Sequence, residues 1–224
     1  LWPLAFFILN LLAIAAWFFL TGALAPGQAK PVSFSPRGSE LDADSIEHID
    51  VVFDSPLDPA SVEPHAVRLH PPAPGTAELV DGRTLRFRLG EKLQPATSYR
   101  LAWSEKLRGS GGREVRQELH SFATARPALV SAEQAGFDNS SYTVQLSFNQ
   151  PVRAETLAAA LSSRLADDDA FRQGDSRVRV LSAGAARSHR VRVPAEKAGW
   201  LVLRLAGGMT ATAGNLGLEK DTDL

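Results

Sequence analysis

Histidine and aspartate are the side chains of this sequence best suited to bind a metal ion. His65 and His70 are five residues apart in a proline-rich stretch, and this interval matches no zinc-ligand spacing that has a geometric rationale. We therefore predict no metal site and expect the histidines to lie on exposed loops and strands. The residues considered for such a site are His48, His65, His70 and His120, with Asp50 or Asp54.

A run of aspartates could bind calcium, because clustered carboxylates are the ligands that this ion prefers. The run consists of Asp167, Asp168 and Asp169, and Asp175 follows in the same polar stretch. It lacks the alternating aspartates and the glycine of a calcium-binding loop. We therefore predict a solvated loop here.

Nucleophilic catalysis by serine needs a strained turn or a histidine–aspartate partner. The stretch RGSGG, residues 108–112, places Ser110 in a flexible turn rather than in a Gly-x-Ser-x-Gly turn after a buried strand. The sequence also lacks a phosphate-binding glycine loop. Cysteine is absent, which excludes thiolate nucleophiles, thiolate zinc sites, disulfides and a lipid-modified N-terminal cysteine. We predict a protein that is not an enzyme, with no catalytic residue, no cofactor and no small-molecule substrate.

Arginines recur at alternate positions of three stretches and could form basic faces toward anionic lipids or an acidic partner. Alternatively, they keep solvent-facing sheet positions soluble and protect strand edges. We favour the second interpretation, because 24 basic residues are balanced by 25 acidic ones. The net charge of -1 also provides no field that would attract nucleic acid. The pairs are Arg86 and Arg88, Arg177 and Arg179, and Arg190 and Arg192.

The elements that carry these residues are repeated along the chain. The stretch FDSPLDPASV, residues 53–62, returns as FNQPVRAETL, residues 148–157, after an alternating apolar stretch in both cases. A second pair of matching stretches follows at 101–112 and 203–214. A period near 100 residues is too long for a solenoid repeat and suits duplicated domains. The matched positions of the second pair are Leu101/Leu203, Trp103/Leu205, Leu107/Met209 and Gly112/Gly214.

Residues 45–127 show the pattern of an immunoglobulin-like β-sandwich, with short alternating strands separated by proline and glycine. Asp58 and Pro59 predict one short helical turn, and Asp81-Gly82 predicts a hairpin turn with positive φ. In LQPATSY, residues 93–99, Tyr99 is either a tyrosine corner, whose hydroxyl bonds back to the preceding loop, or a core aromatic with a solvated hydroxyl.

Residues 128–224 are predicted to form a second, related β-sandwich that is truncated at its C-terminus. Its crossing helix is predicted to be longer than the turn in the first copy, because TLAAALSSRL, residues 156–165, has a helical composition. Strands are predicted around residues 142–148, 178–180, 191–193 and 200–205.

The N-terminal segment, residues 1–25, is apolar and uncharged. Crossing a bilayer takes about 20 such residues. The sequence Ala23-Leu24-Ala25 resembles a signal cleavage site, but the length of the run and Pro26 favour a retained membrane anchor over a cleaved signal. Residues 26–44 contain three prolines and no periodicity, and are predicted to be a flexible linker.

The quoted stretches, together with LRFRLGEKLQPATSYRLAWSEKLRGSGGREV and HSFAT, resemble the bacterial Ig-like domains of envelope proteins. Followed by LSFNQPVRAETL and TATAGNLGLEKDTDL, behind an apolar N-terminus, the order is similar to the start of bacterial alpha-2-macroglobulin-like proteins. These are large periplasmic protease traps built from a string of macroglobulin-type β-sandwich domains. The resemblance covers residues 45–224.

The resemblance implies an all-β fold with two tandem Ig-like, macroglobulin-type β-sandwich domains, preceded by a single N-terminal transmembrane or signal helix. It implies a non-catalytic, membrane-proximal scaffold of a bacterial protease inhibitor. The family's thioester, where present, cannot lie in this cysteine-free chain. The expected location is the bacterial cell envelope, anchored in the inner membrane with the domains in the periplasm, or secreted there after signal cleavage.

Proteases would then be the targets of the full-length protein, the membrane would be contacted through the N-terminal helix, and other envelope proteins are further candidate partners. The alternative function is an Ig-like spacer or stalk of an unrelated envelope protein, such as an adhesin or an envelope enzyme.

Overall fold

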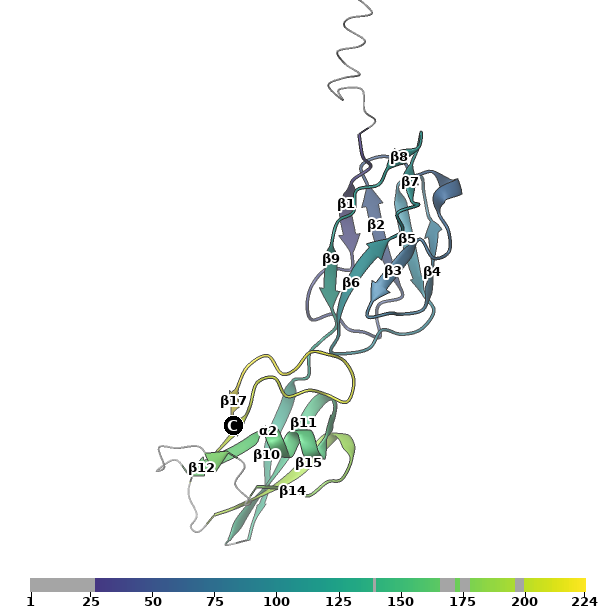
Figure 1. Cartoon of the computed structure of the whole chain (residues 1–224). Coiled ribbons are helices and arrows are strands. Elements are labelled where there is room, and N and C mark those ends of the chain that lie inside the picture. Colours follow the sequence, from purple (N-terminus) through teal and green to yellow (C-terminus); the bar gives the residue numbers. More distant parts are fainter. Residues whose placement is uncertain (1–26, 139, 166–171, 174–177, 196–199) are drawn as a thin grey trace, which may run out of the picture.

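The computed structural model describes residues 27–224 except for residues 139, 166–171, 174–177 and 196–199. These residues form two β-sandwiches that follow each other along the long axis of the molecule (Figure 1). The prediction of an all-β fold is confirmed, because helix in the described residues is limited to one short turn and one seven-residue segment.

A membrane-spanning helix is not found in the part of the chain that the structure describes. The anchor predicted at residues 1–25 lies outside the described residues.

The first sandwich packs a four-stranded sheet, in the order β1-β2-β5-β4, against a three-stranded sheet, in the order β3-β6-β9. All pairs are antiparallel, and the short hairpin β7–β8 closes one end. Its elements are β1 (Pro31–Ser35), β2 (His48–Phe53), η1 (Pro59–Ser61), β3 (Val67–His70), β4 (Gly75–Leu79), β5 (Thr84–Leu89), β6 (Ser98–Trp103), β7 (Arg108–Gly109), β8 (Arg113–Glu114) and β9 (His120–Ala123).

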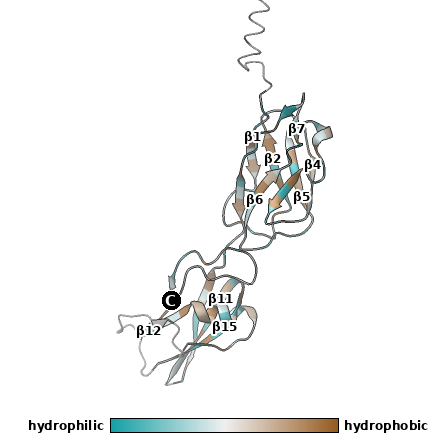
Figure 2. Ribbon diagram, viewed as in Figure 1, coloured by the Kyte–Doolittle hydropathy of each residue, from teal (hydrophilic) through white to brown (hydrophobic). Residues whose placement is uncertain are grey.

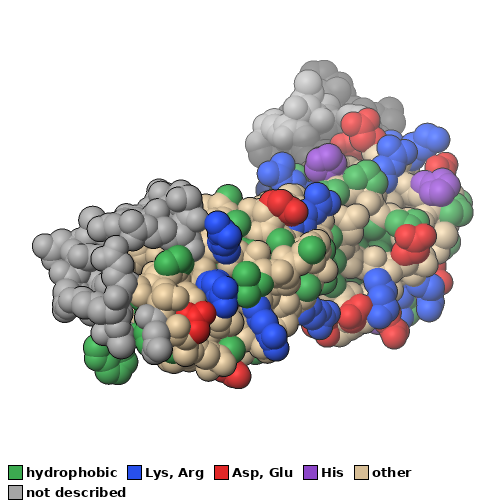
Figure 3. Space-filling model, turned by 90° about the horizontal axis from the view of Figure 1, so that it is seen from below, with side chains coloured by type: hydrophobic (Ala, Val, Ile, Leu, Met, Phe, Trp, Pro, Cys, Tyr) green, Lys and Arg blue, Asp and Glu red, His purple; other side chains and the backbone are tan. Residues whose placement is uncertain are grey.

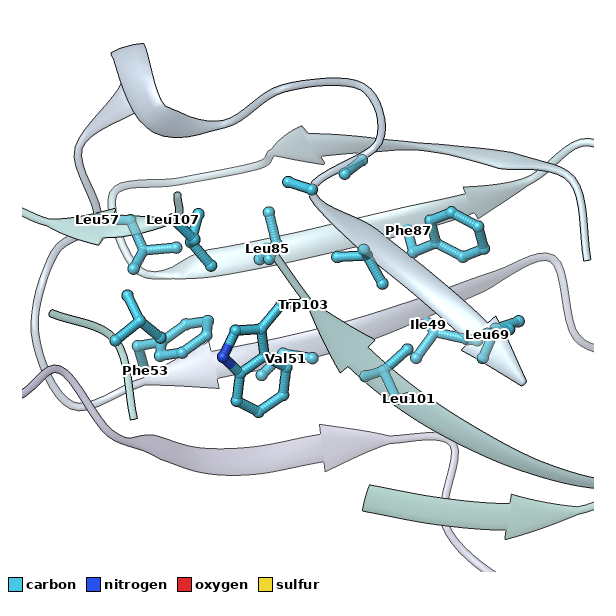
Figure 4. Close-up of a cluster of buried hydrophobic side chains, with 14 of the residues drawn as sticks. Ile49, Val51, Phe53, Leu57, Leu69, Leu85, Phe87, Leu101, Trp103 and Leu107 are labelled. Atoms are coloured by element: carbon cyan, nitrogen blue, oxygen red, sulfur yellow. The ribbon is translucent and has the colours of Figure 1, made fainter. Parts of the chain in front are cut away.

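The core of the first sandwich follows from the alternation along its strands. Side chains of β2 and β5 on one sheet meet those of β6 on the other (Figure 4). Successive residues of a strand point to opposite faces, so every second residue is buried, and Figure 2 accordingly shows hydrophobic and hydrophilic residues mixed along the strands. Each large apolar side chain removed from water contributes about 1.5–3 kcal/mol. Central members of this core are Ile49, Val51, Phe53, Leu85, Leu101 and Trp103.

The second sandwich repeats this arrangement with the sheet orders β10-β11-β15-β14 and β13-β12-β16-β17. Its own core contains Leu146, Phe148, Val191 and Leu203. Its elements are β10 (Leu129–Phe137), β11 (Ser141–Arg153), α2 (Ala154–Ala160), β12 (Leu161–Leu165), β13 (Arg172–Gln173), β14 (Arg179–Val180), β15 (Ala185–Pro194), β16 (Leu201–Leu205) and β17 (Thr222–Asp223).

The sequence repeat has a direct counterpart in backbone hydrogen bonding. The amide of Ser110 donates to the carbonyl of Pro56 at 2.9 Å, and the amide of Thr212 donates to that of Pro151 at 3.0 Å. These four residues are related by the two offsets of the sequence repeat. Gly112 and Gly214 share a positive φ, at 77° and 88°. The two sandwiches are therefore structural copies of each other.

The predicted linker at residues 26–44 is wrong for most of its length. Residues 31–35 form β1, which pairs with β2, and Ala29 is fully buried beside Val115. The amide of Leu41 donates to the carbonyl of Ala123 at 3.1 Å. The stretch lacks apolar alternation because β1 is an edge strand with one solvent-exposed side. The first sandwich thus begins at Ala29 rather than at residue 45.

Two local predictions need correction. The hairpin between β4 and β5 is confirmed, but Gly82 does not adopt positive φ. The Asp81 carboxylate instead holds this turn by accepting hydrogen bonds from the amides of Arg83 and Thr84, at 2.7 and 2.8 Å. Backbone pairing with β16 makes residues 161–165 a strand, so that α2 is longer than η1 but ends at Ala160. Tertiary pairing here overrides helix propensity.

Candidate functional site: the joint between the two sandwiches

The residues considered for a metal site are separated in the structure. Within the described part of the chain, no three His, Asp or Glu side chains come close enough to hold an ion. His48 lies 3.8 Å from the Asp50 carboxylate and is partly exposed, and His65 and His70 lie on the surface. The aspartates at 167–169 and Asp175 lie outside the described residues.

His120 differs from the expected exposed histidine because an aromatic neighbour covers its ring. Its ring stacks on Phe34 with centroids 4.1 Å apart, and Nε2 lies 3.1 Å from the carbonyl oxygen of Pro36. Burial lowers the pKa of His120, partly offset by the contact with this carbonyl. The contact joins β9 to the end of β1 and so helps to close the sandwich.

His189 is a buried histidine that sequence reasoning missed. It is 1% exposed, and its Nδ1 lies 3.0 Å from the Ser182 hydroxyl. Nε2 lies 2.9 Å from the carbonyl of Val152 and 3.0 Å from that of Ala186. The sequence signal for its burial is that His189 lies two residues before the buried Val191, on the same face of the strand. Because the partners of the imidazole are a hydroxyl and two carbonyls, it serves as a structural connector between β11 and β15.

Arg177 lies outside the described residues, whereas the other alternating arginines occupy exposed or half-buried positions, and several of them are paired with acidic residues. Arg86 donates two hydrogen bonds to the Asp50 carboxylate, at 2.8 and 2.7 Å, and Arg88 pairs with Glu78 at 2.7 Å. Arg192 lies 3.2 Å from Asp138. Figure 3 shows basic and acidic side chains interspersed on the face seen there. This arrangement matches the interpretation of ordinary solvent-facing positions.

The stretch LQPATSY, residues 93–99, lies at the end of the first sandwich that faces the second. The amide of Gln94 donates to the Tyr99 hydroxyl at 2.8 Å, which makes Tyr99 a tyrosine corner. The buried Thr124 hydroxyl accepts from the amide of Thr97 at 2.9 Å and donates to the carbonyl of Gln94 at 2.8 Å. Two threonines and a tyrosine thus hold the loop at residues 93–97 in one conformation.

The hydrogen bonds around residues 93–97 hold Ala96 in an unusual backbone conformation. Its φ is 49°, a left-handed conformation that non-glycine residues rarely adopt. Its amide donates to the carbonyl of Ala125 at 3.0 Å, and its side chain is fully buried. The carbonyl of Ala96 is thereby presented toward the second sandwich.

The loop at residues 210–217 of the second sandwich docks on this carbonyl. The amides of Asn215 and Leu216 both donate to the Ala96 oxygen at 2.8 Å, and the Asn215 side-chain oxygen accepts from the amide of Ser98 at 3.1 Å. Gly214 lies so close to the loop that an added Cβ would be 2.3 Å from the carbonyl oxygens of Pro95 and Ala96. The docking therefore depends on a glycine at position 214.

The connecting segment provides the other half of the joint. The Gln150 side-chain amide donates to the carbonyl of Ala125 at 2.5 Å, and that of Asn149 donates to the carbonyl of Arg126 at 2.8 Å. The Arg126 guanidinium donates to the carbonyl of Gly217 at 3.2 Å and lies 3.7 Å from the Glu40 carboxylate. The start of the second sandwich, at Asn149 and Gln150, and its docking loop, at Gly217, thus both contact residues 125–126.

Two shallow hollows flank Arg126, with volumes of about 230 and 400 Å³. The first is lined by Glu40, Leu129 and Lys220, and the second by serines together with Phe122. Neither hollow is lined by a histidine.

No family model and no curated protein matches the sequence. Among solved structures, the N-terminal part of the bacterial S-layer protein SbsC matches with a TM-score of 0.36 and 15% identity, over 96% of this chain and 48% of that one. L,D-transpeptidase 3 from Mycobacterium tuberculosis matches with a TM-score of 0.31 and 16% identity, over 70% of this chain and 55% of that one. The chain thus spans about half the length of these proteins. Overlaps of this size assign neither a family nor a function.

Proposed function

We propose that this chain is a rigid, non-catalytic scaffold that holds its two sandwiches in a fixed orientation. The observation that carries the proposal is the joint, in which the Ala96 carbonyl accepts two amide hydrogen bonds at 2.8 Å from the neighbouring sandwich. Domains that meet through few polar contacts move relative to each other by default. Here the contacts are backbone groups on loops that are themselves clamped, which favours a single relative orientation.

The setting that we propose is the bacterial cell envelope, with the sandwiches in the periplasm. The support is the uncharged apolar stretch at residues 1–25, long enough to cross a bilayer as an anchor. The finer proposal is that the scaffold belongs to an alpha-2-macroglobulin-like protease trap, on the strength of the sequence resemblance at residues 45–224.

Rigidity is testable by distances between spin labels, because the chain has no cysteine of its own. Cysteines replacing the exposed residues Thr76 and Ser188 would place one label in each sandwich. A single narrow distance distribution is expected, as narrow as that of a control pair at Thr76 and Ser121 within the first sandwich. A distribution much broader than the control would overturn the rigid scaffold.

The protease-trap proposal needs the full-length protein. After incubation with a broad-specificity protease, a trap leaves cleavage of a small peptide intact and suppresses cleavage of a large protein. Equal protease activity on both substrates would instead make the two sandwiches a stalk of another envelope protein.

A further inference from the structure

The end of the first sandwich opposite the joint is where the chain enters the fold. Figure 1 shows β7 and β8 at this end, beside the beginning of the described chain. The amide of Ala29 donates to the carbonyl of Glu114, and the amide of Arg116 donates to that of Ala29, both at 2.9 Å. Ala29 is fully buried and packs against Gly109. A Cβ added at Gly109 would lie 3.2 Å from the Cβ of Ala29. The first sandwich is therefore tied firmly to the chain at Ala29.

Very little chain separates this fixed point from the apolar segment. Four residue steps lead from Ala25 to Ala29, and a fully extended chain covers at most about 3.6 Å for each, or roughly 14 Å in all. The headgroup layer on each side of a bilayer is about 5–8 Å thick. If residues 1–25 cross the membrane, Ala29 therefore lies at most about 14 Å from the edge of the hydrocarbon core, which is within the headgroup layer or no more than about 6–9 Å beyond it.

Three cationic side chains lie around this point, beside the two carboxylates of Asp54 and Glu114. Lys30, Arg113 and Arg116 form no salt bridge with any residue that the structure describes. The two carboxylates also accept hydrogen bonds, Asp54 from the amide of Lys30 at 2.9 Å and Glu114 from the Gln28 side chain at 3.4 Å. The backbone hydrogen bond from Lys30 lowers the pKa of Asp54, and the charges of Lys30 and Arg113 lower this pKa further. Three cations therefore stand beside two carboxylates, which leaves an excess of positive charge at this end.

We infer that this end of the first sandwich, formed by residues 28–30 and the hairpin at 108–116, rests on the phospholipid headgroups, with Lys30, Arg113 and Arg116 facing anionic lipids. The inference rests on the proposed membrane anchor. Since the joint lies at the opposite end, the second sandwich would then project away from the membrane.

The test uses the full chain in vesicles that contain a lipid with a nitroxide on its headgroup. A fluorophore on cysteine at Gln117, an exposed residue next to Arg116, reports contact with the headgroups, and one at the exposed Ala135 of β10 is the matched control. Strong quenching at position 117 and little at position 135 is expected. Flotation of the vesicles measures anchoring separately.

Chain that floats with the vesicles but shows equally weak quenching at both positions would overturn the headgroup contact and leave the anchor intact. Chain that does not float would overturn the anchor itself, and the inference with it.

The role of the cations is tested by comparing neutral phosphatidylcholine vesicles with vesicles that contain phosphatidylglycerol. Each cation near an anionic surface is expected to favour contact about five-fold. The triple variant Lys30→Gln/Arg113→Gln/Arg116→Gln should lose the extra quenching seen with phosphatidylglycerol. The control triple Arg179→Gln/Arg190→Gln/Arg192→Gln, in the second sandwich, should retain it. Equal behaviour of the two triples would contradict recognition of anionic lipid.

Discussion

Gly214 of the second sandwich lies directly against the carbonyl of Ala96 in the first, with no room for a side chain between them. Both residues have positive φ, and Ala96 is the described non-glycine residue with this conformation. Because both residues of this contact have an uncommon backbone conformation, we infer that the two loops dock in a single geometry. This contact supports the proposal that a few residues fix the orientation of the two sandwiches.

Gly214→Ala should separate the two sandwiches without unfolding either. The added Cβ meets backbone atoms that cannot move aside as a flexible side chain would. Gly112→Ala is the matched control, because it has a similar φ at the equivalent position of the first copy but open space around it. The control should lose roughly 1–2 kcal/mol from backbone strain alone and keep its small-angle scattering profile. If the Gly214 variant also keeps the profile of the unaltered chain, the contact does not set the orientation.

Tyr99→Phe should destabilise the first sandwich by about 1–2 kcal/mol, because the amide of Gln94 loses its partner in a partly buried loop. The ring contact with Phe122, at 5.5 Å, is kept in this variant. Urea unfolding at constant m-value would measure the change. A midpoint equal to that of the unaltered chain would mean that the hydroxyl is dispensable.

Much of the fold could be predicted because burial follows alternation. Phe53 and Phe148 occupy equivalent positions of the repeat, and both lie in cores. The short turn at η1 was predictable because the Asp58 side chain accepts from the amide of Ala60 at 3.0 Å, as an N-cap does.

The missed features share a physical cause, since each depends on partners distant in sequence. β1 is an edge strand without alternation, and its counterpart β10 has an equally weak pattern. His189 shares the inward side of its strand with Val191, but the carbonyl of Val152 that its imidazole contacts belongs to a strand distant in sequence. The sequence marks the 93–99 motif as structural, but only the docked second sandwich makes it part of a joint.

The pair Asp50 and Arg86 should make stability depend on pH. Two hydrogen bonds from Arg86 lower the pKa of Asp50, against an opposing effect of burial. A carboxyl with a lowered folded-state pKa contributes stability that is present above its ordinary value near 4 and is lost as the pH falls through the lower value. Asp50→Asn should therefore flatten the loss of stability on acidification, measured by urea midpoints between about pH 2 and 6.

Asp44 provides the comparison for Asp50. Its pKa is lowered by a hydrogen bond from Lys92, but both side chains are more than 70% exposed. The effect of Asp44→Asn on the pH dependence of the urea midpoint should disappear at about 1 M salt, where charges are screened within about 3 Å. That of Asp50→Asn should persist in part. If salt changes the effects of the two substitutions equally, the difference in burial between Asp44 and Asp50 has no influence on these effects.

His189→Leu should destabilise the second sandwich by roughly 2–4 kcal/mol, because the carbonyls of Val152 and Ala186 and the Ser182 hydroxyl would be left without the imidazole. Hydrogen exchange should show faster opening of β11 and β15, with β2 and β5 unchanged. Ser182→Ala removes a single partner and should cost about 1 kcal/mol. Uniform loss of protection over both sandwiches would argue against a local role.

Truncation distinguishes a flexible linker from an integral strand. A chain that starts at Gly27 should fold like the longer one, whereas a chain that starts at Pro36 loses β1, Ala29 and the Phe34 side chain that stacks on His120. Burial of these groups is worth about 3 kcal/mol or more. Thermal unfolding of the two chains would measure the difference, and equal melting temperatures would restore the linker interpretation.

The hydrogen-bonding groups that receive the second sandwich lie within residues 93–126, whereas the loop that docks on them comes more than 80 residues later, at 210–217. Domains fold from the N-terminus onward during synthesis. The receiving surface is therefore complete before the docking loop has left the ribosome. We therefore expect assembly to be vectorial, with the finished first sandwich serving as the template against which the second is set.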